Sequence, residues 1–542
     1  MKAALDRVPR WLLALVAGTA AALAHPPFGF LPGLLGYPLL LWLLDTADAD
    51  RPLRSAFWRG WLAGAAYFAI GTWWVSEAFL VDIAAHGWMA PIAVAAMAGG
   101  VALFWGAAGL VYRRLAPSGL VRVLAFASLF SAFEWLRGHI LTGFPWNLPG
   151  ESWRAGSAMS QTASLVGAYG LTWITLATVC TPALWTRGRD GRPGRMAMGA
   201  AVGVLAFLFA WGALRISDAD SQADLGGYRV RIVQADIKQS AKYDPAHFKR
   251  IVDAYVDLTR RPPPKGERPA NFVIWPEGAI PISANEYLAP GTWTRDAIEG
   301  ALLPNQILMV GAYRYETATE IYNSLIVVER SPTRGLIPLG IYDKHRLVPF
   351  GEYMPLDGLM TALGVKALVK VGDGFASGPA PQPLKIPGLP VFQPLICYES
   401  LYPGFTRAGA RASGAAPEFI VNVSNDAWFG STSGPLQHLN LASYRAIEEG
   451  APMLRSTPTG VSAVIDAMGR VDAGPLGLGD TGVIDATLPQ QRFATIYRRL
   501  GDIPFAAMLL LSFGLILGIR VVGPLKRRQN GVKGDREIGI SG

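Results

Sequence analysis

The segment Pro394-Leu395-Ile396-Cys397-Tyr398-Glu399 ends an apolar run with a cysteine and then turns at once to polar residues. A short apolar run of this kind predicts a buried strand. The thiol of Cys397 would then stand at a strand end, where it can meet a substrate. A cysteine after an apolar strand is more often an inert packing residue, so its meaning depends on the other strand ends of the chain.

Two further segments repeat this pattern of an apolar strand followed by an ionisable residue. Phe272-Val273-Ile274-Trp275-Pro276-Glu277 presents a carboxylate, and Leu339-Gly340-Ile341-Tyr342-Asp343-Lys344 presents an ammonium group. A thiol that attacks a carbonyl needs a base for its proton, and a buried carboxylate can serve. A fixed ammonium group would stabilise the resulting oxyanion. The three residues therefore predict a nucleophilic site with Cys397 as nucleophile, Glu277 as base and Lys344 as oxyanion donor.

Other interpretations of the same residues stay open from the sequence. The backbone N–H of Tyr398 could be a second oxyanion donor, by analogy with other nucleophile elbows. Glu277 could instead be a turn residue that faces water. Lys344 could form a surface ion pair with Asp343 or Glu352.

The composition predicts a membrane protein. Of the 542 residues, 51% are hydrophobic and 16% are charged, which is too apolar for an ordinary soluble protein. A helix needs roughly 17 to 25 apolar residues to cross a bilayer. We predict eight spans, the first two being shorter, near residues 11–24, 30–45, 55–80, 90–112, 121–141, 162–186, 196–215 and 503–523.

The net charge of +9 belongs to this membrane part. Residues 216–500 hold 27 Lys and Arg against 28 Asp and Glu, so the excess lies elsewhere. Basic residues gather in alternate connections between the predicted spans, as the positive-inside rule describes. The distribution predicts that both termini are cytoplasmic and that residues 216–500 face outward. It gives no reason to expect a nucleic-acid partner.

Three regions follow from these patterns: transmembrane helices 1–7 in residues 1–215, an extracytoplasmic catalytic domain in 216–500, and an eighth helix with a basic tail in 501–542. The middle region is predicted to be α/β, because β-branched runs alternate with amphipathic patterns. Strands are expected at 228–237, 272–275, 306–313, 321–328, 336–342, 391–397, 419–423 and 461–465, and helices at 247–261 and 435–450.

The motifs at these strand ends resemble those of a known family. Trp275-Pro276-Glu277, Tyr342-Asp343-Lys344 and Cys397-Tyr398-Glu399 are similar to the Glu-Lys-Cys signature of the nitrilase, or carbon–nitrogen hydrolase, superfamily. Further motifs resemble its membrane-bound branch, the apolipoprotein N-acyltransferases of bacterial inner membranes. These motifs are Ser424-Asn425-Asp426-Ala427-Trp428-Phe429-Gly430, Arg445-Ala446-Ile447-Glu448, Gly71-Thr72-Trp73-Trp74-Val75 and Thr142-Gly143-Phe144-Pro145-Trp146.

The resemblance implies an αββα nitrilase-like domain in the periplasm and a ping-pong acyl transfer without a cofactor. Cys397 would take an acyl chain from a phospholipid, usually phosphatidylethanolamine in this family, as a thioester. The α-amine of a diacylglyceryl-modified apolipoprotein would then receive it. Glu352, Tyr398 and Glu399 match family positions that support the site, and Tyr243 is expected to support it as an aromatic residue where relatives have Trp.

The chain departs from the family pattern in two places. Relatives commonly show Gln-Gly-Asn-Ile-Pro and then Lys-Trp, where this chain has Gln234-Ala235-Asp236-Ile237-Lys238 and then Lys242-Tyr243. Pro458 stands where Asn is usual. His438 is predicted to be a structural hydrogen-bonding residue. No metal site is predicted, because the six histidines are scattered.

Two rival functions share these residues. A membrane-tethered nitrilase-type amidase would use the same triad on a small amide, with water as acceptor. A transport or binding protein could carry an inactive domain of the same fold, although the intact triad argues against that. The paired motifs around Trp74 and Trp146 favour the transferase, since a tether needs only one span. A monomer is expected.

Overall fold

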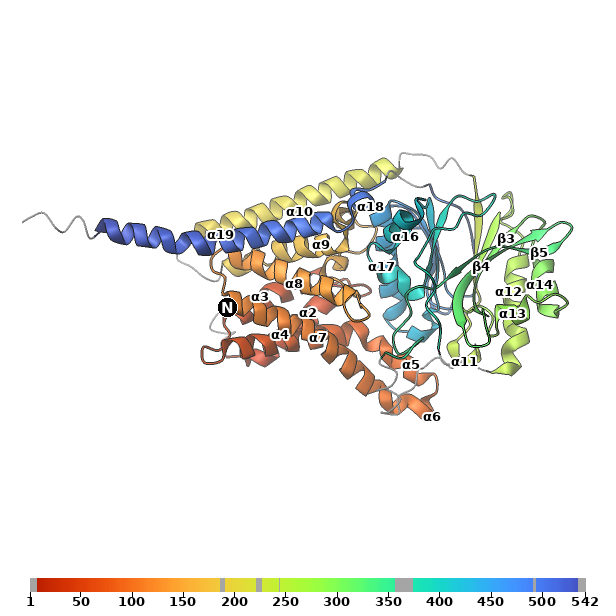
Figure 1. The fold of residues 1–542 in the computed structure, drawn as a ribbon, viewed down its shortest axis with the longest axis horizontal. Coiled ribbons are helices and arrows are strands. Elements are labelled where there is room, and N and C mark those ends of the chain that lie inside the picture. Colours follow the sequence, from red (N-terminus) through yellow and green to blue (C-terminus); the bar gives the residue numbers. More distant parts are fainter. Residues whose placement is uncertain are drawn as a thin grey trace, which may run out of the picture.

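The computed structural model describes residues 7–185, 191–220, 227–242, 244–355, 374–490 and 494–534. It has two parts, a bundle of helices and an α/β domain that sits on one end of the bundle (Figure 1). The bundle comprises α2 (Arg10–Leu23), α3 (Gly36–Asp45), α4 (Pro52–Thr72), α5 (Ser76–Leu80), α6 (Ile83–His86), α7 (Ala90–Leu115), α8 (Val121–His139), α9 (Ala163–Val179), α10 (Gly191–Asp220), α18 (Ile496–Leu500) and α19 (Ile503–Gly534).

Helices lie at all eight predicted stretches, but their lengths differ. Among the residues that the structure describes, three helical stretches are long and apolar enough to cross a membrane, and these are Ile83–Leu115, Met159–Leu184 and Arg192–Ala219. Three more, Arg10–Leu23, Leu31–Asp45 and Ile503–Gly518, are apolar but shorter. The apolar helices of the N-terminal region are thus confirmed, whereas the number of spans stays a prediction.

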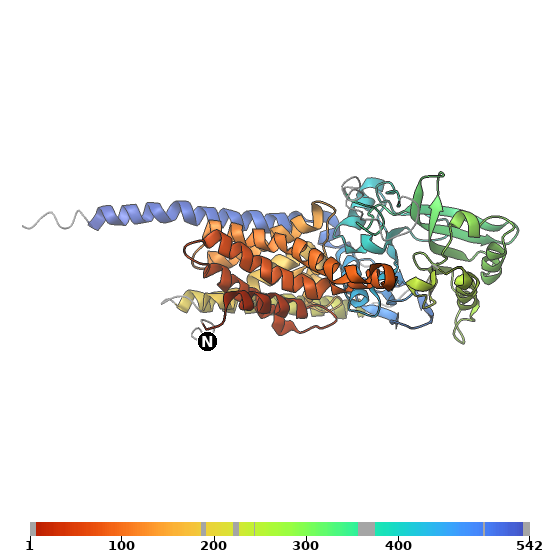
Figure 2. The ribbon, with the colours of Figure 1, turned by 90° about the horizontal axis from the view of Figure 1, so that it is seen from below.

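Small residues let these helices pack closely, as is usual between helices in membranes. A Cβ built on Gly60 of α4 would lie 2.5 Å from the carbonyl oxygen of Trp105 in α7. Seen from the side, the helices run along the long axis of the molecule and the α/β domain continues that axis (Figure 2).

Two sheets form the α/β domain. The six-stranded sheet has the order β11-β1-β2-β3-β4-β5, and the five-stranded sheet has the order β10-β9-β8-β7-β6. The strands are β1 (Arg229–Gln234), β2 (Phe272–Trp275), β3 (Ile307–Tyr315), β4 (Ile321–Ser331), β5 (Gly335–Asp343), β6 (Phe392–Ile396), β7 (Phe419–Val423), β8 (Met453–Ser456), β9 (Ser462–Ile465), β10 (Val471–Leu476) and β11 (Gly482–Thr487).

The side chains of these strands alternate between two cores, as the pleat of a strand requires. In β2, Phe272 and Ile274 point to the core between the sheets, where Phe392, Phe419 and Leu454 meet them. Val273 and Trp275 point the other way, to α12 (Phe248–Arg260) and α14 (Trp293–Ala301).

The five-stranded sheet is covered by α16 (Phe405–Ser413) and α17 (Gly434–Glu449). The four layers form the αββα sandwich that the family resemblance implied. Helix α17 lies between this sheet and the helical bundle (Figure 1).

The predicted strands at 272–275 and 419–423 match β2 and β7, and the other predicted strands agree within a few residues at their ends. The predicted helices at 247–261 and 435–450 correspond to α12 and α17. Strands β8, β10 and β11 were not predicted.

Candidate active site

Cys397 occupies a strained turn directly after β6. Its φ of 48° lies in the left-handed region, which is uncommon for a residue with a side chain. The residue opens a short 3-10 helix, Cys397–Leu401, and Ser400 Oγ donates a hydrogen bond of 2.8 Å to its carbonyl oxygen. This sharp change of direction places Cys397 directly after a strand end, and its role as a nucleophile stays a prediction.

Glu277 follows β2, and its position depends on a close approach by β3. A Cβ built on Gly311 of β3 would lie 2.5 Å from Glu277 Cα, so glycine is needed there. The carboxylate Oε1 accepts a 2.7 Å hydrogen bond from Asn323 Nδ2 in β4. Lys344 follows β5, and its Nζ lies 3.3 Å from the same Oε1.

Glu352 completes this cluster. Its Oε1 lies 2.8 Å from Lys344 Nζ and accepts a 2.9 Å hydrogen bond from Asn323 Nδ2. Its Oε2 accepts a 2.8 Å hydrogen bond from the backbone N–H of Val348. The side chain of Lys344 is 1% exposed, which excludes the surface ion pair considered from the sequence. Glu277 is buried as well, so it is not a turn residue facing water.

The charges of this cluster act on one another and on the thiol. Burial lowers the pKa of Lys344, but the negative charges of Glu277 and Glu352 outweigh it and hold that pKa above its usual value. Burial and the charge of Glu277 together raise the pKa of Cys397 to about 12, although the charge of Lys344 opposes them. The thiol is therefore protonated at neutral pH, and its attack needs a base.

Glu399 connects the two sheets beside Cys397. Its Oε2 accepts a 2.8 Å hydrogen bond from the N–H of Ile396, and its Oε1 accepts one of 2.7 Å from the N–H of His345. Burial raises the pKa of Glu399 to about 7, although these N–H groups and Lys344 lower it. Because His345 follows Lys344, this side chain fixes the end of β5 against the end of β6.

Tyr398 fixes the same turn to the helical bundle. Its hydroxyl donates a 2.6 Å hydrogen bond to the carbonyl oxygen of Gly143, in the connection between α8 and α9. Tyr402 donates a second hydrogen bond of 2.9 Å to that oxygen. The turn that carries Cys397 is therefore held by the connection between α8 and α9 of the helical bundle.

A polar network that the sequence did not predict lies behind Cys397. His438 Nε2 is 3.0 Å from Ser400 Oγ, and His438 Nδ1 is 3.0 Å from Asp426 Oδ1. Arg455 NH2 lies 2.7 Å from Asp426 Oδ2. Burial raises the pKa of Asp426, but Arg455 and His438 outweigh it and hold that pKa at about 2. The prediction that His438 is a structural hydrogen-bonding residue agrees with this network.

Trp74 and Trp146, which mark the two membrane motifs, pack against this network. Their ring centroids are 4.5 Å apart, and Phe429 lies 4.6 Å from Trp74. Trp146 Nε1 donates a 2.9 Å hydrogen bond to Gln437 Oε1 in α17. The motifs around Trp74 and Trp146 thus contact the α/β domain close to Cys397, which a simple tether would not require.

Asn323 is a further site residue that was not predicted from the sequence. The sequence feature that could have identified it is a polar side chain inside the apolar strand β4, and its amide bridges Glu277 and Glu352.

Tyr243, predicted to support the site, lies outside the described residues. Pro458 accepts a 3.1 Å hydrogen bond from the N–H of Ile237, which joins the two segments that depart from the family pattern.

Comparison with known proteins assigns both parts of the chain. The carbon–nitrogen hydrolase family matches residues 229–498, and the apolipoprotein N-acyltransferase N-terminal domain matches residues 17–181. A relative named apolipoprotein N-acyltransferase from Caulobacter vibrioides is 58% identical over 94% of this chain and 94% of its own. One of the same name from Rhodopseudomonas palustris is 37% identical over 94% and 95%.

Among solved structures, an amidase from Nesterenkonia sp. shares 18% identity over 53% of this chain and 97% of its own, with a TM-score of 0.36.

Proposed function

This chain belongs to the apolipoprotein N-acyltransferase family, and we propose that it acylates lipoproteins through a thioester on Cys397. The acyl donor is a membrane phospholipid, which we take to be phosphatidylethanolamine. The acceptor is the α-amine of an N-terminal diacylglyceryl-cysteine. The observation that carries this proposal is the pair of hydrogen bonds from Tyr398 and Tyr402 to Gly143, because they hold the nucleophile's turn against the membrane part.

In the first half-reaction, Cys397 Sγ attacks the ester carbonyl as Glu277 takes the thiol proton. The tetrahedral oxyanion lies near Lys344, whose ammonium group stabilises the negative charge. The intermediate collapses, the C–O bond breaks, and Glu277 returns the proton to the leaving glycerol oxygen. A thioester and a lysophospholipid result.

In the second half-reaction, the amine of the lipoprotein attacks the thioester. Glu277 takes a proton from this nitrogen, the C–S bond breaks, and the proton returns to sulfur. The product is an amide. Water must be kept from the thioester during this time, because hydrolysis would compete with aminolysis.

Glu277, not Glu352, is assigned as the base because of its free oxygen. Within the described residues, both hydrogen-bonding contacts of Glu277 fall on Oε1, which leaves Oε2 for the thiol proton. Glu352 uses Oε1 for Lys344 and Asn323 and Oε2 for Val348. Glu352 and Glu399 are therefore positioning residues.

We assign residues 1–215 to seven spans, 216–500 to a periplasmic domain, and 501–542 to an eighth span with a cytoplasmic tail. The positive-inside distribution supports this orientation in the bacterial inner membrane. The start of α2 and the far end of α19 lie at the end of the bundle opposite the α/β domain (Figure 1), as an even number of spans requires. The protein acts as a monomer.

Intact mass spectrometry of the detergent-purified protein tests this function. Incubation with phosphatidylethanolamine should add one fatty acyl mass to the wild type and none to Cys397→Ala. A diacylglyceryl-cysteine peptide should then remove the adduct and gain the acyl group. If no phospholipid forms an adduct while small amides are hydrolysed, the chain is a membrane-tethered amidase, the function that the named relatives do not favour.

A further inference from the structure

We propose that Lys242 binds the phosphodiester of the phospholipid donor and is thus a second cation of the active site. This inference rests on the proposed function, in which a phospholipid supplies the acyl chain. Lys242 would act in thioester formation only, because the diacylglyceryl-cysteine acceptor carries no phosphate.

The first argument is the place of Lys242. It ends α11 (Gln239–Lys242), and Gln239, three residues earlier, shares its face of the helix. Gln239 Oε1 accepts a 2.9 Å hydrogen bond from Asn425 Nδ2, which precedes Asp426 in the network behind Cys397. A Cβ built on Gly278 would lie 3.6 Å from Lys242 Nζ. This face of α11 therefore points at the residue after the catalytic base.

The second argument is that the ammonium group of Lys242 lacks a hydrogen-bond partner. Lys242 Nζ is buried and has no hydrogen-bond partner among the residues that the structure describes. Burial lowers the pKa of Lys242 to about 8, although the charge of Glu277 opposes this shift. Lys344, in contrast, is paired with two carboxylates. A buried ammonium without a partner is costly, so Lys242 is the cation left for an anionic ligand.

The third argument is the chemistry of the substrates. In a glycerophospholipid, the phosphodiester lies only the length of the glycerol backbone from the ester that is attacked. Lysine binds phosphate well as a point charge, and its flexible stem lets the ammonium turn toward an entering ligand. The phosphodiester would supply the partner that Lys242 lacks.

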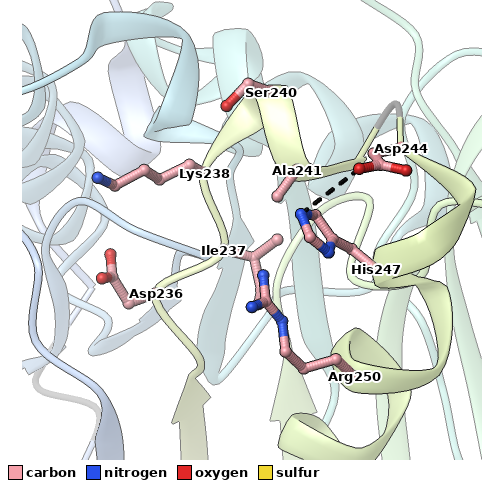
Figure 3. A pocket seen from close by; sticks show the side chains of 8 residues that line it. All are labelled: Asp236, Ile237, Lys238, Ser240, Ala241, Asp244, His247 and Arg250. Carbon is pink, nitrogen blue, oxygen red and sulfur yellow. Dashed lines mark ion pairs between the residues drawn. The ribbon is translucent and has the colours of Figure 1, made fainter.

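The opposite face of α11 offers a matched control. It borders a surface pocket of about 430 Å³, shown in Figure 3, whose lining includes Lys238, Ala241 and Arg250 but not Lys242. Lys238 is exposed and lies four residues before Lys242. Substitution of Lys238 removes a positive charge from the same segment and leaves the buried ammonium group of Lys242 in place.

The test compares two acyl donors in single turnover, with the acyl adduct on Cys397 followed by intact mass. One donor is phosphatidylethanolamine in detergent micelles, and the other is the p-nitrophenyl ester of palmitic acid, which has no phosphate. Lys242→Met should slow thioester formation from the phospholipid about 10- to 100-fold, the loss expected for one charged hydrogen bond. It should leave the rate with the aryl ester within about twofold.

Lys238→Met should match the wild type with both donors, and Lys242→Arg should recover part of the rate with the phospholipid. Equal slowing of Lys242→Met with both donors would overturn the proposal, because Lys242 would then act through Glu277. An unchanged rate with phospholipid, or slowing in Lys238→Met alone, would overturn it as well. If the wild type takes acyl groups from the aryl ester but from no phospholipid, the proposed function itself fails.

Discussion

Helices α12 and α17 cover the sandwich from opposite sides, yet they bury their side chains differently. α12 buries one apolar face, with Ile251, Tyr255 and Leu258, and leaves Lys249 in solvent. α17 is buried along almost its whole length, including the polar residues Gln437, His438, Asn440, Arg445, Glu448 and Glu449. The difference arises because α12 meets solvent where α17 meets the helical bundle.

The contacts of α17 explain how its polar residues can be buried. Asn440 Nδ2 donates a 3.0 Å hydrogen bond to the carbonyl oxygen of Glu151, and Glu448 Oε1 accepts one of 2.9 Å from the N–H of Ala168. Buried polar groups need such partners. The inner half of the sandwich, which comprises the five-stranded sheet with α16 and α17 and includes Cys397, is thus held by the helical bundle. The outer half comprises the six-stranded sheet with α12 and α14 and includes Glu277 and Lys344, which are held by ion pairs within that half.

The largest expected effect comes from Lys344→Met, in the outer half. The oxyanion loses its cation, and the two buried carboxylates of Glu277 and Glu352 lose the ammonium group that they share. Thioester formation from the aryl ester should fall at least about 10²- to 10³-fold, measured by intact mass in single turnover. A loss below about tenfold would mean that Lys344 is not the oxyanion donor.

A smaller effect is expected on the alkylation rate of Cys397 in the absence of substrate, and in one variant this rate should increase while acyl transfer decreases. Because the pKa of Cys397 is raised to about 12, its alkylation by iodoacetamide should rise about tenfold per pH unit from pH 8 to 10, with no plateau. Glu277→Gln removes a negative charge that raises this pKa, so alkylation at pH 9 should increase about tenfold or less. Lys344→Met should decrease it.

These rates are measured by mass on a Cys180→Ala background, because Cys180 is the only other cysteine. Glu277→Gln should thus make the thiol more reactive while acyl transfer is lost. A thiol that becomes less reactive in this variant would show that Glu277 already holds the thiol proton in the resting enzyme. The outer half would then control the nucleophile more strongly than its charges indicate.

Glu277 and Cys397 could be selected from the sequence because each follows an apolar run at a predicted strand end. The runs before Glu277 and Cys397 are buried on both faces in β2 and β6, so no alternation was needed to find them. β10 was missed because its residues are largely exposed, and β8 because Arg455 interrupts a four-residue run. The side chain of Arg455 is buried against Asp426, a partner 29 residues away that no local pattern reveals.

The polar burial of α17 could not be predicted for a related reason. A period of 3.6 residues identifies the helix, but which polar residues are covered depends on the bundle that packs on them. The contacts that cover α17 come from Trp146, Glu151 and Ala168, all about 280 residues or more away along the chain. The same holds for Asn323, whose carboxylate partners are distant in sequence.

Two tryptophans that make equivalent hydrogen bonds sharpen the comparison further. Trp146 Nε1 donates to Gln437 Oε1 in α17, and Trp275 Nε1 donates to Thr259 Oγ1 in α12, both at 2.9 Å. Replacing either by Phe leaves a buried acceptor unpaired and should cost about 1 to 3 kcal/mol of stability. Thermal unfolding in detergent should show similar losses.

Of these two substitutions, only Trp146→Phe should affect the reactivity of Cys397. Gln437 precedes His438, which supports the turn of Cys397 through Ser400, so Trp146→Phe should change the alkylation rate of Cys397 severalfold. Trp275→Phe should not, because the indole faces α12. Equal changes in both variants would mean that the effect follows general destabilisation, and the inner half would lose its special link to the nucleophile.

The smallest effect is expected from Lys249→Met on α12. Lys249 pairs with Asp253 at 2.6 Å, but its side chain is 74% exposed and that of Asp253 is 45% exposed. Its ammonium also lies 5.7 Å from the ring of Trp293. Exposed contacts of both kinds contribute at most about 1 kcal/mol, so thermal unfolding should shift little and acyl transfer should stay within about twofold.

Because water already surrounds the charge of Lys249, its removal leaves no buried partner behind, unlike removal of a polar residue from α17. A clear loss of acyl transfer in this variant would show that the solvent face of the outer half meets a substrate, and the division between the two halves would not hold.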